Sequence, residues 1–164
     1  MYTYAAITDI GPYYEKNDDR ILVADEVLSV GESSGSWEKE YFLTAICDGV
    51  GGLDCGYEAA QTGLLTIREL SGRHPDRSSI RSAVETANTD IRMQQEHRGL
   101  VDGMRTTLAG ISVYGKDAYV FNAGDSRVYL YRKERIHRLS KDHSVVQELI
   151  DVGKLTEEEA RMYP

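Results

Sequence analysis

The stretch EYFLTAICDGVGG, residues 40–52, combines an apolar strand with a glycine-rich turn. Residues 40–47 are aromatic or apolar at most positions, which predicts a β-strand. Asp48 follows directly, beside glycines whose backbone can approach a ligand closely. A carboxylate in this position can present oxygen to a metal ion, or it can be a turn aspartate that accepts backbone hydrogen bonds. This stretch therefore predicts a strand of the fold and, at its end, a candidate metal-ligating residue.

The composition is that of a globular domain of ordinary size. The chain has 164 residues, of which 41% are hydrophobic and 28% are charged, and this is enough for one domain with a hydrophobic core. A net charge of -8 argues against nucleic-acid binding, which needs a cationic surface, and allows cation binding. No apolar run reaches the length of a membrane span and no secretory signal opens the chain, so we expect a cytoplasmic protein without membrane contact. Cys47 and Cys55 are expected to be reduced thiols.

The apolar periodicity predicts strands, then two helices, then strands again. A helix is expected after Gly56, and Ser78 or Ser79 can cap a second helix that ends near His97. Capping boxes predict two short helices that begin near residues 144 and 156, whereas residues 31–36 are expected to form a polar turn. The expected strands cover residues 2–8, 20–24, 40–47, 107–114, 118–123, 127–131 and 135–139, with the later ones forming a meander. This order favours an α+β fold over alternating α/β.

Two other acidic groups accompany Asp48. Asp18 and Asp19 precede the strand expected at residues 20–24, and Asp125 lies between the strands expected at 118–123 and 127–131. Each group alone is compatible with an ordinary turn. Strand ends on one rim of a sheet can converge, so together they predict an oxygen-rich pocket for Mg2+ or Mn2+. Such ions make bound water more acidic and can neutralise a phosphate, which points to a metal-dependent phosphatase.

Other glycine-rich motifs do not fit the same residues. A dinucleotide fingerprint that begins at Gly49 would need glycine at position 54, which is Asp54, and an EF-hand loop would need an oxygen ligand at Val50. The turn lacks the Gly-Lys-Ser/Thr sequence of a P-loop. Residues 124–128 lack the final glycine of a nucleophile elbow.

Five short motifs occur in the order and approximate spacing of the PPM (type 2C) metal-dependent Ser/Thr protein phosphatases. They are residues 17–19 (NDD), 48–52 (DGVGG), 105–107 (RTT), 123–127 (AGDSR) and 142–144 (DHS). The resemblance covers essentially the whole chain, and residues 149–160 resemble the segment that leads into the flap of that family. It implies two packed antiparallel β-sheets flanked by helices, a four-layer αββα sandwich. Residues 1–164 would form the N-terminal, incomplete portion of one such domain.

The resemblance also implies a site for two, or with a weaker site three, Mn2+ or Mg2+ ions. Asp48 would bridge two ions, and the Gly49 carbonyl would bind one of them. Asp18 would hold the water shell of that ion, with Asp19 in support, and Asp125 would belong to the third site. A bridging water would attack the phosphorus of phosphoserine or phosphothreonine in a protein substrate without a phosphoenzyme. Asp48 and Asp19 would thus be the catalytic residues.

Several positions depart from the family pattern. Tyr14 stands where an arginine usually grips the substrate phosphate, and tyrosine supplies neither a positive charge nor a bidentate fork. We therefore expect weaker substrate binding at Tyr14 unless another cation, such as Lys16, takes over. Arg105 replaces a glycine before Thr106 and Thr107, which would hydrogen-bond near the metals. A long cation at position 105 could perturb the metal loop or could itself reach a phosphate. Position 50 carries valine where some eukaryotic members use a histidine, which indicates a bacterial-type enzyme.

The family also continues beyond the flap with further strands and two more metal-ligating aspartates, which the 164 residues do not contain. Two other hypotheses therefore stay open. The chain could be a catalytically impaired pseudophosphatase or regulatory module that uses the fold to bind proteins. Alternatively, a dimer or a complementing chain could restore the sandwich and its missing ligands.

Overall fold

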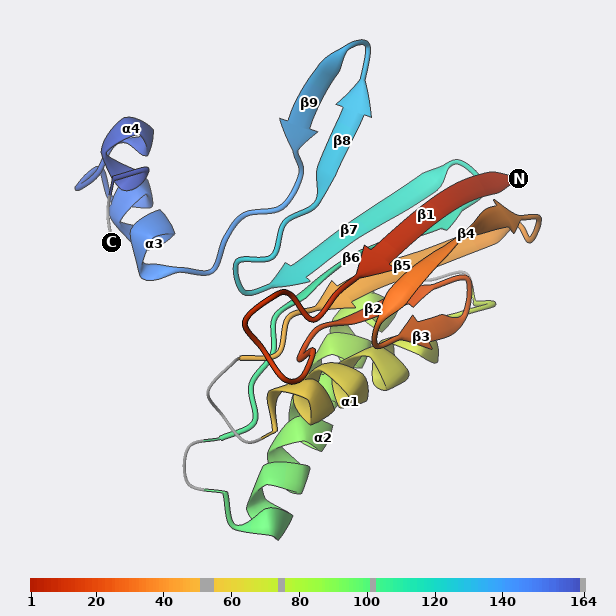
Figure 1. The fold of residues 1–164 in the computed structure, drawn as a ribbon. Coiled ribbons are helices and arrows are strands. Elements are labelled where there is room, and N and C mark those ends of the chain that lie inside the picture. Colours follow the sequence, from red (N-terminus) through yellow and green to blue (C-terminus); the bar gives the residue numbers. More distant parts are fainter. Residues whose placement is uncertain (51–54, 74–75, 101–102, 163–164) are drawn as a thin grey trace.

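The structure is a computed structural model that describes residues 1–50, 55–73, 76–100 and 103–162. Nine strands and four helices lie in these ranges (Figure 1). The strands are β1 (Tyr2–Thr8), β2 (Arg20–Val23), β3 (Glu26–Leu28), β4 (Gly31–Trp37), β5 (Tyr41–Cys47), β6 (Leu108–Tyr114), β7 (Asp117–Ala123), β8 (Tyr129–Arg132) and β9 (Arg135–Arg138). The helices are α1 (Gly56–Arg68), α2 (Arg77–Arg98), α3 (Val145–Asp151) and α4 (Glu157–Ala160).

A five-stranded antiparallel sheet forms the centre, in the strand order β3-β2-β5-β6-β7. Helices α1 and α2 pack on each other and cover one face, while the antiparallel pair β1–β4 lies over the other face (Figure 1). Phe42 of β5 joins the two sheets, because its ring stacks on Tyr2 at 5.4 Å and on Tyr4 at 6.2 Å between ring centroids. The α+β class with packed antiparallel sheets and flanking helices is therefore confirmed.

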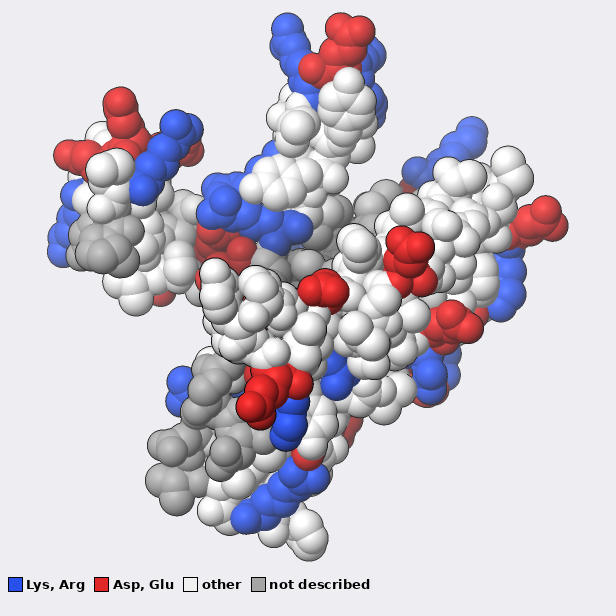
Figure 2. Space-filling model, viewed as in Figure 1, with Lys and Arg blue, Asp and Glu red and all other residues white. Residues whose placement is uncertain are grey.

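The C-terminal elements project from this stack. Strands β8 and β9 form a separate two-stranded sheet, and α3 and α4 lie beyond it, away from the central sheet (Figure 1). Figure 2 shows the hairpin and the helical end as separate protrusions that carry both acidic and basic side chains. The meander expected from β6 to β9 is wrong at one step, because in the described part of the chain β7 pairs with β6, and β8 pairs with β9 instead of β7.

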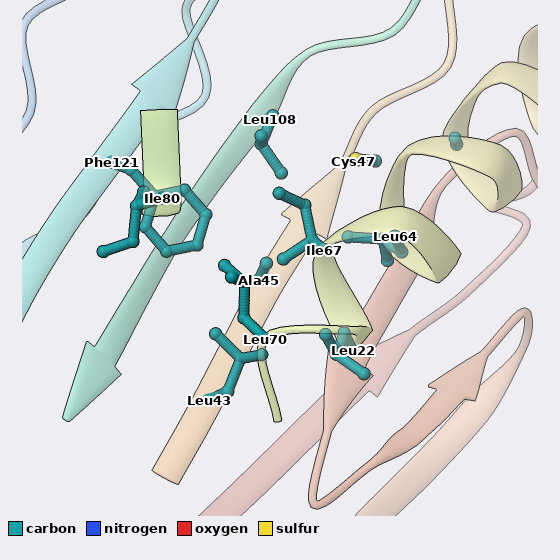
Figure 3. Close-up of a cluster of buried hydrophobic side chains, with 11 residues drawn as sticks. Leu22, Leu43, Ala45, Cys47, Leu64, Ile67, Leu70, Ile80, Leu108 and Phe121 are labelled. Atoms are coloured by element: carbon teal, nitrogen blue, oxygen red, sulfur yellow. The ribbon is translucent and has the colours of Figure 1, made fainter. Parts of the chain in front are cut away.

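The main core lies between the central sheet and the helices (Figure 3). Alternation along β5 turns Leu43, Ala45 and Cys47 toward the helices, and all three are buried. Gly110 of β6 lies opposite Ala45, and a methyl group there would approach the Phe121 ring to 2.5 Å. Glycine is therefore required at position 110 for the Phe121 ring to pack. The other members of the core are Leu22, Ala60, Leu64, Ile67, Leu70, Ile80 and Leu108.

Three local predictions need correction. Residues 31–36 are not a turn but most of β4, which pairs with β1 along its whole length; its largely polar residues are explained by its exposed position. Helix α2 is capped by Asp76 rather than by Ser78 or Ser79, although Ser79 returns the hydrogen bond and completes a capping box. Strand β8 begins at Tyr129 instead of residue 127, because its pairing with β9 begins at Tyr129 opposite Arg138.

The short C-terminal helices begin where the sequence predicts. Thr156 and Glu159 form a complete capping box at α4. Ser144 caps α3 by accepting from the Gln147 backbone N–H, but the Gln147 side chain donates to Asp151 instead of closing the capping box.

Among the described residues, no helix is long and apolar enough to cross a membrane. Both cysteines are free and buried, as expected, and burial raises the pKa of Cys47 to about 12.

Candidate active site

The acidic residues before β2 and after β5 meet at one rim of the central sheet. Arg20, the first residue of β2, pairs with Cys47, the last residue of β5. Because the two strands are antiparallel neighbours, Asp19 and Asp48 are placed side by side just beyond this pair. The predicted convergence of these strand ends is confirmed for the two motifs.

A cavity of about 350 Å3 opens at this rim. Its walls are residues 9–11, Tyr14, residues 16–19, Asp48 and Gly49. It therefore contains Asp18, Asp19, Asp48 and Gly49, all expected to serve one metal centre. Glycines 51 and 52 of the same motif lie outside the described residues.

The carboxylates in this cavity repel one another. Partial burial raises the pKa of Asp19, and the charge of Asp48, a hydrogen bond with Asp48 and the charge of Asp18 raise it further, while Arg20 opposes them. Like charges that approach in this way share protons or attract a cation. The rim thus holds more negative charge than its own side chains balance.

Close backbone contacts bring the Asp18 segment against the Asp48 turn. A methyl group on Gly49 would lie 2.4 Å from the carbonyl oxygen of Gly56 and 2.7 Å from that of Asp18. A methyl group on Gly56, the first residue of α1, would lie 2.9 Å from the Val50 carbonyl oxygen. Only glycine fits at positions 49 and 56, so these residues let three chain segments meet at the site.

Two threonines anchor the backbone of Asp48, as expected. The Thr106 hydroxyl and the Thr107 backbone N–H donate to the Asp48 carbonyl oxygen at 3.0 and 2.9 Å, and the Asp48 N–H donates to Thr107 Oγ1 at 3.1 Å. Thr107 Oγ1 also lies 2.6 Å from Ser126 Oγ, beside Asp125. Arg105 contributes its backbone carbonyl, which accepts from the Val50 N–H.

Asn17 and Arg20 hold the acidic turn in place, and sequence reasoning missed both roles. The Asn17 side chain donates to Thr8 Oγ1 and to the Ser29 carbonyl oxygen, and it accepts from the Asp19 N–H. The Arg20 guanidinium, 9% exposed, donates to the carbonyl oxygens of Asn17 and Asp19. An asparagine two residues before a turn amide is the signal that could have identified the first role.

Asp125 lies at a different cavity. It lines a hollow of about 790 Å3 together with Arg127, Arg138, Asp142 and residues of α3 and α4. Asp142 is 8% exposed and is bonded by the Arg127 guanidinium through Nε at 3.0 Å and Nη2 at 2.5 Å. Ser126 and Thr107 form the hydrogen-bonded link between this loop and Asp48. The assignment of Asp125 to a third metal site stays a prediction.

The donor set at the rim suits a hard divalent cation. Asp18, Asp19 and Asp48 offer carboxylate oxygens, Gly49 offers a carbonyl oxygen, and the excess negative charge favours a cation. Within the described ranges, no three Asp, Glu, His or Cys side chains already surround a common point as metal ligands. Residues therefore fit the ion by chemical type and location, with waters or further ligands completing the shell.

Comparison with known proteins identifies the class to which this fold and site belong. The family described as Protein phosphatase 2C matches residues 15–149, and the chain therefore belongs to this family. It is 45% identical to protein phosphatase PhpP of Streptococcus pneumoniae, covering 96% of this chain and 62% of that protein. It is 30% identical to the serine/threonine protein phosphatase PstP of Mycobacterium tuberculosis, covering 98% of this chain and 29% of that protein.

Solved structures agree with this assignment. The crystal structure of Mycobacterium tuberculosis PstP aligns with a TM-score of 0.79 at 29% identity, covering 99% of this chain and 63% of that one. A structure of the PstP catalytic domain in complex with two manganese ions aligns with a TM-score of 0.75 at 29% identity, covering 97% and 63%. The chain thus spans less than two thirds of the length of these relatives.

Proposed function

We propose that the protein containing this chain hydrolyses phosphoserine and phosphothreonine in phosphorylated proteins with the help of Mn2+ or Mg2+. The observation that carries this proposal is the meeting of Asp18, Asp19 and Asp48 in one cavity at the rim of β2 and β5. Membership of the Protein phosphatase 2C family supports it. So do the relatives named serine/threonine phosphatases, one of them crystallised with two manganese ions.

In this proposal, residues at the rim have distinct roles. Asp48 and the Gly49 carbonyl hold the ions, Asp18 and Asp19 hold the surrounding water shell, and Asp125 serves a third, weaker site. The ions, when bound, offset phosphate charge and make water a better nucleophile. Thr106 and Thr107 hold the backbone of Asp48 in place, so the point from which its carboxylate extends is constant.

The remaining assignments extend the same proposal. Residues 1–164 form the N-terminal portion of a single phosphatase domain of bacterial type, which acts in the cytoplasm as part of a signalling system. Where this chain acts alone, a dimer or a complementing chain supplies further ligands. Equilibrium sedimentation of residues 1–164 tests that step, since a monomer that binds Mn2+ unaided would exclude it.

The decisive experiment compares Mn2+-dependent hydrolysis of a phosphothreonine peptide by the full-length protein and its Asp48→Asn variant. We expect a loss of about a thousandfold in kcat/KM, in line with removal of a central charged group at a metal site. Asp117→Asn, at the exposed start of β7, is the matched control and should retain full activity. Equal activity of wild type and Asp48→Asn would refute the proposal.

A second candidate is a pseudophosphatase or regulatory module that binds proteins through the same fold. Tyr14 favours it, because it stands at the usual arginine position and is 72% exposed, without a positive charge for a phosphate. This candidate predicts that the metal-loaded full-length protein binds a phosphothreonine peptide and leaves it intact. Turnover that depends on Asp48 would rule it out.

A further inference from the structure

We propose that Lys16 is the substrate-binding cation of this phosphatase and takes the place of the arginine that Tyr14 replaces. This inference rests on the proposed phosphatase function and assigns one further residue to it. Lys16 lies two residues before Asp18 and lines the same cavity as Asp18, Asp48 and Gly49. Among the described residues that line this cavity, Lys16 is the one basic side chain.

The ammonium group of Lys16 is oriented by an aromatic ring. Its Nζ lies over the ring of Tyr57 at 5.7 Å from the centroid, which is within the range of a cation–π contact. Tyr57 is the second residue of α1, and its hydroxyl donates to Glu58 Oε1 at 2.7 Å. Glu58 in turn forms an ion pair with Arg98 of α2. The ring is thus fixed by both helices and limits the directions that Lys16 can take.

The hydrogen-bond donors of Lys16 remain available for a ligand. Its Nζ has no hydrogen bond or ion pair within the part of the chain that the structure describes, although it lies over the Tyr57 ring. An ammonium group carries three donors. A phosphate monoester that enters the cavity can therefore accept from Lys16 without breaking an existing bond.

Two arginines in this part of the chain already have partners. Arg20 also lies over the Tyr57 ring, at 5.8 Å, but it is buried and its guanidinium donates to Asn17, Asp19 and Gln61. Arg127 is paired with Asp142 at the other cavity. Lys16 is consequently the basic side chain of the cavity lining that can offset phosphate charge among the carboxylates of the rim.

Because a lysine is a point charge rather than a bidentate fork, it should strengthen phosphate binding without fixing phosphate orientation. Its removal should therefore affect KM more than kcat. Lys16→Ala in the full-length protein is expected to raise KM for a phosphothreonine peptide about tenfold, the effect of one charge-assisted hydrogen bond. We expect kcat to stay within about twofold.

The test compares Lys16→Ala, Lys16→Arg and Lys116→Ala. Lys16→Arg should restore KM, and Lys116→Ala, which removes an exposed lysine at the β6–β7 turn, should leave it unchanged. Calorimetric titration of the Mn2+-loaded proteins with inorganic phosphate provides a readout independent of turnover, and Lys16→Ala should bind phosphate about tenfold more weakly. Adding Tyr14→Arg to Lys16→Ala should recover most of this affinity.

An unchanged KM and an unchanged phosphate affinity in Lys16→Ala would overturn the inference. A tenfold drop in kcat with KM unaffected would overturn it as well. These results leave the phosphatase proposal standing, because that proposal fails if the wild-type protein does not hydrolyse the peptide or if Asp48→Asn retains full activity. The two failures are therefore distinguishable.

Discussion

The two cavities described above shift the pKa values of their aspartates in opposite directions. At the rim of β2 and β5, Asp19 lies beside Asp18 and Asp48, and its pKa is raised by burial and by their negative charge. At the base of the β8–β9 hairpin, hydrogen bonds from Arg127 hold the pKa of Asp142 below its usual range despite burial. The charge of Asp142 is balanced by the arginines beside it, whereas the carboxylates of the rim face one another and would gain from a bound cation. This difference supports the site proposed at the rim and a structural role for Asp142.

The largest effect on stability is expected from Gly49→Ala, which places a side chain where the backbone segments of the rim are in close contact. The added methyl group would clash with carbonyl oxygens of Gly56 and Asp18, so we expect a loss of about 3 kcal/mol in the free energy of unfolding. Urea denaturation of residues 1–164 measures it. Gly63→Ala in α1, where the nearest atom would be Cys47 Sγ at 3.4 Å, is the control and should change stability by less than about 1 kcal/mol. Equal stability of both variants would show that the rim is not tightly packed.

Replacing Asp142, whose charge is balanced by arginines, should lower the free energy of unfolding whether or not a metal ion is present. Asp142→Asn leaves Arg127 and Arg138 without their shared carboxylate. Breaking a buried pair costs about 3–5 kcal/mol, and we expect about 2 kcal/mol because the Arg127 side chain is 44% exposed. Asp151→Asn, in an exposed pair with Lys141, should cost less than about 1 kcal/mol. A loss in Asp142→Asn no larger than in this control would contradict the structural role.

The corresponding substitution at the rim, Asp19→Asn, should weaken metal binding without lowering the stability of the metal-free protein. Asp19→Asn removes one of several mutually repelling charges, so the metal-free protein should be as stable as wild type or more stable by up to about 1 kcal/mol. With Mn2+ present, the variant should bind the ion more weakly than wild type. Thermal unfolding with and without Mn2+ measures both. A metal-free loss comparable with that of Asp142→Asn would erase the distinction between the two cavities.

The pH dependence of stability sharpens the same comparison. The Asp142 carboxyl has a folded-state pKa below its ordinary value of 3.8, chiefly because Arg127 donates to it. The folded state therefore binds this proton less readily than the unfolded state, and the stabilisation is present above about pH 4 and lost as pH falls through the folded pKa. Urea denaturation should show a constant difference between wild type and Asp142→Asn from pH 7 to 5, which shrinks below pH 4. A difference that grows on acidification would be the wrong sign.

The sequence predicts the rim better than the second cavity because their signals differ in kind. Asp48 follows a strand whose apolar pattern is strong, and Asp19 precedes another, so strand ends alone locate both residues. The pairing of Arg127 with Asp142 joins side chains 15 residues apart across the β8–β9 hairpin, and no periodicity in the sequence predicts it. The direction of Lys16 likewise depends on a ring from α1. Strand β4 escaped prediction because its exposed, polar residues lack the apolar alternation that usually marks a strand.

The smallest effect concerns the link between the two regions. Thr107 accepts from the Asp48 N–H and its hydroxyl contacts that of Ser126, next to Asp125. Thr107→Val should cost about 1 kcal/mol, because it leaves the Asp48 N–H without its acceptor. Ser126→Ala should cost less, since Ser126 is partly exposed and water can replace it. In a double-mutant cycle, residues in one hydrogen-bonded network should show a coupling of about 0.5–1 kcal/mol. If the effects of the two substitutions were strictly additive, the loop that carries Asp125 would be energetically independent of Asp48. The two cavities would then be separate sites without coupling through this link.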